Sequence, residues 1–201
     1  QFAHNLQQVV QSLGAECGVL FENEGERLSV VDERGRIVAG SRLLAVFARL
    51  IASATPNSAI AVPVNAPSVI ESLVEPYGVQ VIRTRADVRS LMAVAVEQAD
   101  RLCFAGDVQG GFIFPQLQPG FDAMFAFMKL LEITQRLDCG LSEIVDQIPP
   151  FVMLHRTIEC PWELKGRVMR LLAQKVSGRT ETLDGLKVYT DHSWALVLPD
   201  A

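Results

Sequence analysis

The chain has 201 residues, which is enough for one large domain or for one and a half domains of ordinary size. Hydrophobic residues make up 49% of the sequence, which allows a substantial core and excludes a disordered chain. The formal net charge of −5 leaves no basic excess to neutralise phosphates, so nucleic acid is excluded as a partner. No apolar run approaches the ~20 residues that cross a bilayer, so no membrane partner is expected.

The cysteines and the two ends of the sequence bear on where the protein resides. Its four cysteines are widely spaced and form no C-x-x-C pair, which favours free thiols in a reducing cytoplasm. The first residues are polar and helix-like, unlike a signal peptide. Because the chain begins at Gln1 without Met and ends after a strand-like run, we expect a fragment of a longer cytoplasmic polypeptide.

The first predicted elements are a helix and two strands. Apolar residues at helical spacing predict a helix over 2–13, and Gly14 ends it. The runs 18–21 and 28–31 are short, apolar and rich in β-branched or aromatic residues, which is typical of buried strands. These two strands flank a polar turn at 22–27.

This turn is strongly acidic. Glu22, Glu24 and Glu26 stand at alternate positions, and Arg27 follows them. A tight turn with carboxylates at i, i+2 and i+4 can direct them to one point, which is how oxygen-rich loops hold Mg²⁺ or Ca²⁺. The alternative is an acidic, solvent-facing hairpin in which Arg27 neutralises its neighbours. The spacing alone leaves both interpretations open.

Between residues 40 and 148 the pattern alternates between helices and strands, with Ser41 and Asp87 as candidate helix caps. The predicted helices are 40–54, 67–77, 87–98, 122–137 and 141–148. The predicted strands are 59–63, 79–84, 102–105 and 112–114, with a glycine-rich turn at 106–111. This rhythm predicts an α/β fold, in which helices sandwich a mixed sheet.

A pair of prolines, Pro149–Pro150, is the best candidate for a domain boundary. After it the pattern changes to a strand at 152–159, a helix at 162–175 and two strands at 186–190 and 194–198. We expect this part to be a smaller α+β unit with an antiparallel sheet.

Several segments, in order, resemble the α-D-phosphohexomutase superfamily of phosphomannomutases and phosphoglucomutases. In that family one strand ends in an Asp-x-Asp-x-Asp-Arg loop and the next ends in Val-Asp-Glu-x-Gly. Residues 22–27 have Glu in place of each Asp of the loop, and 31–35 match the second motif. Segments 141–149, 183–188 and 193–197 are similar to the family's "LSel…lP" and "DGhkh…Wvlh" patterns.

The resemblance covers nearly the whole chain and implies its domain organisation. Residues 1–35 correspond to the end of the family's second domain, 36–148 to its third domain and 149–201 to the start of its fourth. The family's nucleophilic serine lies in the first domain, so the resemblance assigns no catalytic residue to this chain. Other domains of the same polypeptide are the implied partners, and an oligomer is compatible with this assignment.

The resemblance also assigns Mg²⁺ to the acidic loop, with Glu22, Glu24 and Glu26 as the candidate ligands. One extra methylene in each ligand moves its carboxylate outward, whereas Mg²⁺ needs near-octahedral geometry at about 2.1 Å. We therefore expect Mg²⁺ binding to be weakened or abolished, or a looser ion to be accepted.

The implied substrate is a sugar phosphate. The family's sugar loop reads Gly-Glu-x-Ser-Gly-His, and residues 106–111 read Gly-Asp-Val-Gln-Gly-Gly. Asp107 and Gln109 keep hydrogen-bonding groups of different reach, and Arg27 and Arg85 are further candidates for substrate contact. The alternatives are a turn whose glycines supply positive φ at 106–111, and solvent-facing arginines at Arg83, Arg85 and Arg89.

These altered loops lead to two hypotheses of function. The first is a phosphohexomutase-like module of carbohydrate metabolism, regulatory or structural within a larger sugar nucleotidyltransferase such as a mannose-1-phosphate guanylyltransferase. The second is an active phosphomannomutase or phosphoglucomutase, an intramolecular phosphotransferase, of which this chain is a fragment. Residues 198–201, in place of the family's Arg-Pro-Ser-Gly phosphate clamp, favour the first. A pure interaction module, a third class, predicts no binding of sugar phosphates.

Overall fold

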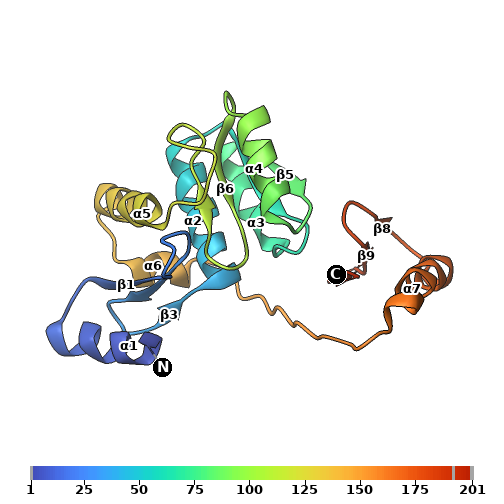
Figure 1. Ribbon diagram of the computed structural model, residues 1–201. Helices are drawn as coiled ribbons and strands as arrows, with labels where there is room; N and C mark the ends of the chain where they lie inside the picture. The colour runs from blue at the N-terminus through green and yellow to red at the C-terminus, as the bar shows by residue number, and fades with distance from the viewer. Residues whose placement is uncertain (1, 192, 200–201) are drawn as a thin grey trace. The chain divides into compact units, whose positions relative to one another are not determined.

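The computed structural model describes residues 2–191 and 193–199 (Figure 1). The chain divides between Val152 and Met153 into two compact units, which are described separately. In the described part of the chain, no helix has the length and apolar character needed to cross a membrane.

The first unit contains the predicted alternation of helices and strands. Its helices are α1 (Phe2–Leu13), α2 (Gly40–Ala54), α3 (Val69–Val74), α4 (Val88–Glu97), α5 (Ala123–Leu137) and α6 (Leu141–Asp146), with a 3₁₀ turn η1 (Glu75–Tyr77). Its strands are β1 (Cys17–Phe21), β2 (Leu28–Asp32), β3 (Ile37–Val38), β4 (Ala59–Pro63), β5 (Gln80–Thr84), β6 (Leu102–Gly106) and β7 (Phe112–Ile113).

Four of these strands form the predicted mixed sheet, in the order β5-β4-β6-β7. β4 runs parallel to both β5 and β6, whereas β7 is antiparallel to β6. Because side chains alternate along a strand, Ile60 and Val62 join the larger core on one face, and Ala59 and Ala61 pack with Leu91 of α4 on the other. Helices thus cover both faces, which confirms the predicted α/β sandwich (Figure 1).

Aromatic rings fill the larger core. Phe47 of α2 lies 6.0 Å from Phe104 of β6 and 4.2 Å from Phe112 of β7, measured between ring centroids. All three side chains are fully buried. This cluster fixes α2 against the strands whose ends carry the loop 106–111.

The remaining strands form a second sheet, in the order β1-β2-β3, with antiparallel pairing. The two-residue strand β3 was not predicted, because the pattern of so short a segment cannot be separated from that of a loop. A second difference concerns the start of α2. Its N-cap is Ala39, so the predicted cap Ser41 lies in the first helical turn, and no side chain caps this end.

A buried carboxylate holds the β2–β3 hairpin. Asp32 is completely buried and accepts hydrogen bonds from the backbone N–H groups of Arg34 at 3.1 Å and Arg36 at 2.8 Å. The Arg36 guanidinium also donates to Asp32 at 2.7 Å and extends to Asp146 of α6. This chain of contacts attaches the β1-β2-β3 sheet to α6.

A second carboxylate, that of Glu33, also links the segment after β2 to α6. The Ser142 hydroxyl and backbone N–H both donate to Glu33, the latter at 3.1 Å. Burial opposes ionisation of Glu33, but these hydrogen bonds outweigh it, so the pKa of Glu33 lies below its ordinary value of 4.5.

The lowered pKa of Glu33 predicts a pH-dependent contribution to stability. A depressed carboxyl pKa adds stability above the pKa of the unfolded state, and this stability is lost as the pH falls through the folded-state value. The natural chain should therefore be more stable than Glu33→Gln near neutral pH, and this difference should shrink between about pH 5 and pH 3. Urea unfolding across this range measures it, and Ser142→Ala should weaken the same pH dependence. A difference that does not change with pH would contradict the prediction.

The second unit contains α7 (Trp162–Lys175) and the strands β8 (Thr180–Glu181), β9 (Leu186–Tyr189) and β10 (Trp194–Val197). The strands pair antiparallel in the order β10-β9-β8, as expected for an α+β unit. The predicted strand at 152–159 was wrong. That segment has strand-like apolar residues, but its side chains are exposed and no described strand pairs with it, so His155 lies outside any strand.

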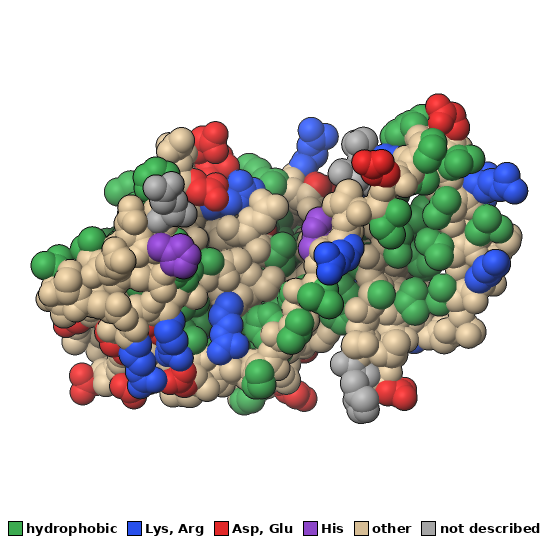
Figure 2. All heavy atoms as spheres, turned by 90° about the horizontal axis from the view of Figure 1, so that it is seen from below, with side chains coloured by type: hydrophobic (Ala, Val, Ile, Leu, Met, Phe, Trp, Pro, Cys, Tyr) green, Lys and Arg blue, Asp and Glu red, His purple; other side chains and the backbone are tan. Residues whose placement is uncertain are grey.

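Charged side chains are mixed on the face shown in Figure 2. Groups of Lys and Arg lie next to Asp and Glu, and neither sign forms an extended patch there.

Candidate functional site

A small cavity lies at the carboxyl ends of the parallel strands. In open α/β sheets, ligands bind in the crevice outside these ends. The cavity has a volume of about 160 Å³. Its lining residues come from the acidic turn, the β4–α3 turn, the β5–α4 loop with α4, and the β6–β7 loop: Arg27, Pro63, Asn65, Ala86, Asp87, Val88, Leu91, Asp107, Val108 and Gln109.

An ion pair joins two of the predicted site residues across this cavity. Both Nε and Nη2 of Arg27 lie 3.4 Å from Oδ2 of Asp107, although the residues are 80 positions apart in sequence. Their side chains are only 20% and 14% exposed. The Arg27 guanidinium also lies 5.6 Å from the ring centroid of Phe121, a favourable cation–π arrangement. The Arg27–Asp107 contact thus holds the acidic turn against the loop 106–111.

The loop 106–111 is shaped by the Asp107 carboxylate. Its Oδ1 accepts hydrogen bonds from the backbone N–H groups of Gln109 and Gly111, each at 2.8 Å. Gly110 has φ +99°, a value that L side chains rarely adopt, and its carbonyl accepts from the Leu28 N–H at 3.1 Å. The loop therefore has the glycine-dependent turn given above as an alternative, and this turn holds Gln109 at the rim of the cavity.

The three glutamates of the acidic turn are solvent-exposed. Glu22 lies 3.9 Å from Nη1 of Arg27, and its backbone N–H donates to the Arg27 carbonyl at 2.9 Å. Within residues 2–191 and 193–199, no group of three or more His, Cys, Asp or Glu side chains is arranged to hold a metal ion. The three carboxylates do not fit Mg²⁺ in this geometry, which is that of an acidic hairpin with Arg27 as the neutralising partner.

The basic residues Arg83, within β5, and Arg85, just after it, make contacts of their own. Arg83 donates to Glu71 of α3, with a closest distance of 2.6 Å, and to backbone carbonyls of the β4–α3 connection. Arg85 is exposed, lies 3.5 Å from Asp87 and is not among the residues that line the cavity. The structure therefore does not gather these arginines around the cavity.

Asp87 acts as the N-cap of α4. Its Oδ1 accepts the Ser90 N–H at 2.7 Å, and this hydrogen bond lowers the pKa of Asp87 below 3.8. A carboxylate therefore occupies the N-terminus of the helix that lines the cavity, where a phosphate would otherwise bind.

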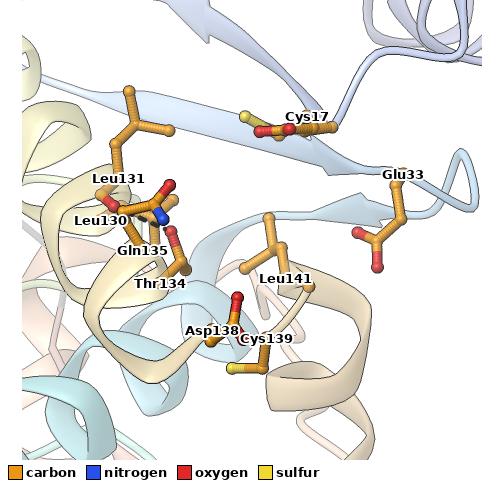
Figure 3. Close-up of a pocket in the computed structure, with 11 residues that line it drawn as sticks. Cys17, Glu33, Leu130, Leu131, Thr134, Gln135, Asp138, Cys139 and Leu141 are labelled. Carbon is orange, nitrogen blue, oxygen red and sulfur yellow. Dashed lines mark hydrogen bonds between the residues drawn. The ribbon is translucent and has the colours of Figure 1, made fainter.

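A second, larger cavity of about 310 Å³ lies between the β1-β2-β3 sheet and the connection from α5 to α6. Figure 3 shows Cys17 and Cys139 on its opposite walls. Burial raises the pKa of both thiols, as do the carboxylates of Glu16 near Cys17 and Glu143 near Cys139. A raised pKa keeps these thiols protonated near neutral pH, and protonated thiols are poor nucleophiles.

The segment 198–201, predicted to replace the family's phosphate clamp, is only partly described. Residues 200 and 201 lie outside the described part of the chain, and Leu198 follows β10 directly.

The fold and the cavity define an α/β protein that presents a small cavity, lined by polar and apolar side chains, at the carboxyl ends of its parallel strands. Residues 39–151 match the family described as phosphoglucomutase/phosphomannomutase, alpha/beta/alpha domain III. The chain therefore belongs to the phosphoglucomutase/phosphomannomutase family, which confirms the resemblance seen in its motifs.

Known relatives extend the similarity beyond that domain. The chain is 28% identical over 186 residues to the phosphoglucosamine mutase of Methanococcus vannielii, covering 90% of this chain and 41% of the relative. It is 30% identical over 199 residues to the probable phosphoglucosamine mutase of Methanococcoides burtonii, covering 96% and 43%. The chain spans less than half the length of these relatives.

Solved structures show the same fold. A phosphoglucomutase/phosphomannomutase family protein from Burkholderia thailandensis superposes with a TM-score of 0.81 at 25% identity, covering 98% of this chain and 43% of that protein. A putative phosphomannomutase from Thermus thermophilus has a TM-score of 0.70 at 18% identity, covering 97% and 44%, and shows the likeness of fold alone.

Proposed function

We propose that this chain is the sugar-binding part of a phosphohexomutase-family protein and that the sugar ring of a hexose phosphate enters the cavity at Arg27 and Asp107. The observation that carries the proposal is the contact between these two residues. It brings the family's metal loop and sugar loop together at the strand ends where α/β proteins bind ligands. Gln109, at the rim, is the further polar contact.

The geometry favours binding over phosphoryl transfer. Phosphoryl transfer depends on positioned charges that stabilise the reacting phosphoryl group, usually with a metal ion. Here the three glutamates are exposed and Asp107 is held by Arg27. We therefore place the chain as a regulatory or structural sugar-phosphate module, and a larger sugar nucleotidyltransferase is one context for it.

A second candidate is an active mutase whose remaining parts lie outside this chain. The observation that favours it is the similarity to proteins named phosphoglucosamine mutase over 90% and 96% of this chain. On this view, glucosamine phosphate is the substrate, and Mg²⁺ binds the acidic turn after a local rearrangement.

Calorimetry tests the proposal. Glucosamine 6-phosphate and mannose 1-phosphate, titrated up to millimolar concentration, should bind the chain with Kd of about 1 mM or below. Arg27→Ala should weaken this binding at least about tenfold, because it leaves the Asp107 carboxylate without its cation. The matched control Glu24→Gln changes an exposed residue of the same turn and should bind like the natural chain. Absence of binding by the natural chain would favour a pure interaction module.

The same control variant separates binding from catalysis. If the active-mutase alternative holds, the complete polypeptide converts hexose 6-phosphates to 1-phosphates in the presence of Mg²⁺, and Glu24→Gln lowers that activity. Binding that is independent of both Mg²⁺ and Glu24 supports the non-catalytic role.

A further inference from the structure

Asn65 is a feature of the cavity that the sequence motifs did not indicate. It lies in the turn that follows β4, where two backbone hydrogen bonds fix the chain on either side of it. The Val64 N–H donates to the Thr84 carbonyl at 2.8 Å, and the Ala66 N–H donates to the Pro63 carbonyl at 2.9 Å. The Asn65 side chain is thereby held in the wall of the cavity.

Its amide oxygen has no hydrogen-bond partner. Among the described residues, every other buried side-chain nitrogen or oxygen has a hydrogen-bond partner, and Oδ1 of Asn65 is the exception. A buried polar atom without a partner is destabilising, so such atoms are rare and often mark functional positions. A ligand in the cavity that donates a hydrogen bond would remove this cost.

The charges around the cavity indicate what kind of donor fits. Its lining contains one cationic side chain, Arg27, and two carboxylates, Asp87 and Asp107. Arg27 pairs with Asp107, and Asp87 caps α4 and lies 3.5 Å from Arg85, so the charges at the cavity nearly balance. The acceptor oxygen of Asn65 cannot bond a phosphate oxygen, whereas a hydroxyl or an ammonium group can donate to it, and the ammonium forms the stronger, charge-assisted hydrogen bond.

The size of the cavity also limits the ligand. Its volume of about 160 Å³ lies below the ~300 Å³ at which pockets for drug-sized ligands begin. It therefore suits a single sugar ring better than a nucleotide sugar.

We infer that Asn65 is a specificity-determining residue, whose amide oxygen accepts a hydrogen bond from a donor on the bound sugar ring and favours an amino sugar over the matching neutral sugar. The inference rests on the proposed binding of a sugar phosphate in this cavity. It adds Asn65 as a sugar contact and a preference for an amino sugar. The phosphate of the ligand lies outside the cavity in this arrangement, so it contributes equally to both sugars.

The test compares two ligands that share the same phosphate. Glucosamine 6-phosphate and glucose 6-phosphate are titrated into the natural chain and into Asn65→Leu and Asn65→Ala at pH 6.5, where the amine is largely protonated. The natural chain should prefer glucosamine 6-phosphate by about fivefold or more, as expected for one charge-assisted hydrogen bond. Both variants should bind it about tenfold more weakly and lose the preference.

Thermal unfolding separates recognition from a structural role. Since Asn65 makes no hydrogen bond through Oδ1, Asn65→Leu should unfold at a temperature equal to or above that of the natural chain, and Asn65→Ala serves if the leucine disturbs the turn. An unchanged sugar preference in a folded variant overturns the role of Asn65 and leaves the proposed function standing. Failure of the natural chain to bind either sugar phosphate overturns both.

Discussion

Gly110→Ala is expected to destabilise the first unit by about 2–4 kcal/mol and to abolish binding at the cavity. At this position φ is +99°, so any L side chain is strained. A Cβ atom would also lie 2.4 Å from the Leu28 carbonyl oxygen, which is a backbone atom inside the β1-β2-β3 sheet and cannot move aside. Either the loop 106–111 separates from β2, or the Arg27–Asp107 contact breaks.

Gly25 provides the matched control. It also has positive φ, at +69°, but a Cβ there would meet no atom within 4 Å. Gly25→Ala should therefore cost only the backbone strain, about 1 kcal/mol, and should leave sugar-phosphate affinity nearly unchanged. Urea unfolding and calorimetry on the two variants make the comparison. Equal losses of stability would show that the approach of Gly110 to Leu28 is unimportant.

Asp32→Ala is expected to cost about 3 kcal/mol, because it removes a fully buried carboxylate that three donors share. The backbone N–H groups of Arg34 and Arg36 lose their acceptor, and water does not reach the site easily. The β2–β3 hairpin should then detach from α6. Urea unfolding followed by circular dichroism measures the loss.

The other end of the same network supplies the control. Asp146 pairs with Arg34 and Arg36, but its side chain is 44% exposed, so Asp146→Ala should destabilise the chain much less than Asp32→Ala. Asp32→Asn should fall between the two, since an amide oxygen still accepts the backbone N–H groups. If Asp32→Ala and Asp146→Ala destabilise the chain equally, the buried carboxylate does not hold the hairpin.

Much of the fold could be predicted because its elements carry strong periodicity. The helices α2 and α7 and the strand β4 begin and end at the predicted residues, since each is uniformly apolar or amphipathic over its length. The two-residue strand β3 could not be predicted, because Ile37–Val38 carries no period, whereas β7 lies within the predicted strand 112–114. The segment 152–159 has the residues of a strand, but strand formation needs a pairing partner, which local sequence does not reveal.

The candidate site also has a part that the sequence predicts and a part that it does not. Arg27, Asp107 and Gln109 could be named from motifs because each stands in a loop between recognisable strands. Their meeting at one cavity depends on the hydrogen bond between Leu28 and Gly110 and on other contacts distant in sequence. Asn65 carries no motif, and only its unpartnered oxygen marks it.

The contact between the acidic turn and the loop 106–111 also bears on where the third domain can be separated from what precedes it. Arg27 forms an antiparallel bridge with Gly111, beside the short strand β7. The buried side chains of Leu28 and Val30 lie in the same core as Phe104. A piece cut at residue 39, where the family match begins, would expose this apolar surface and the unprotected strand edge, which are features that promote aggregation. We therefore expect the unit that folds independently to include residues before 39 and to be larger than the domain outlined by sequence similarity.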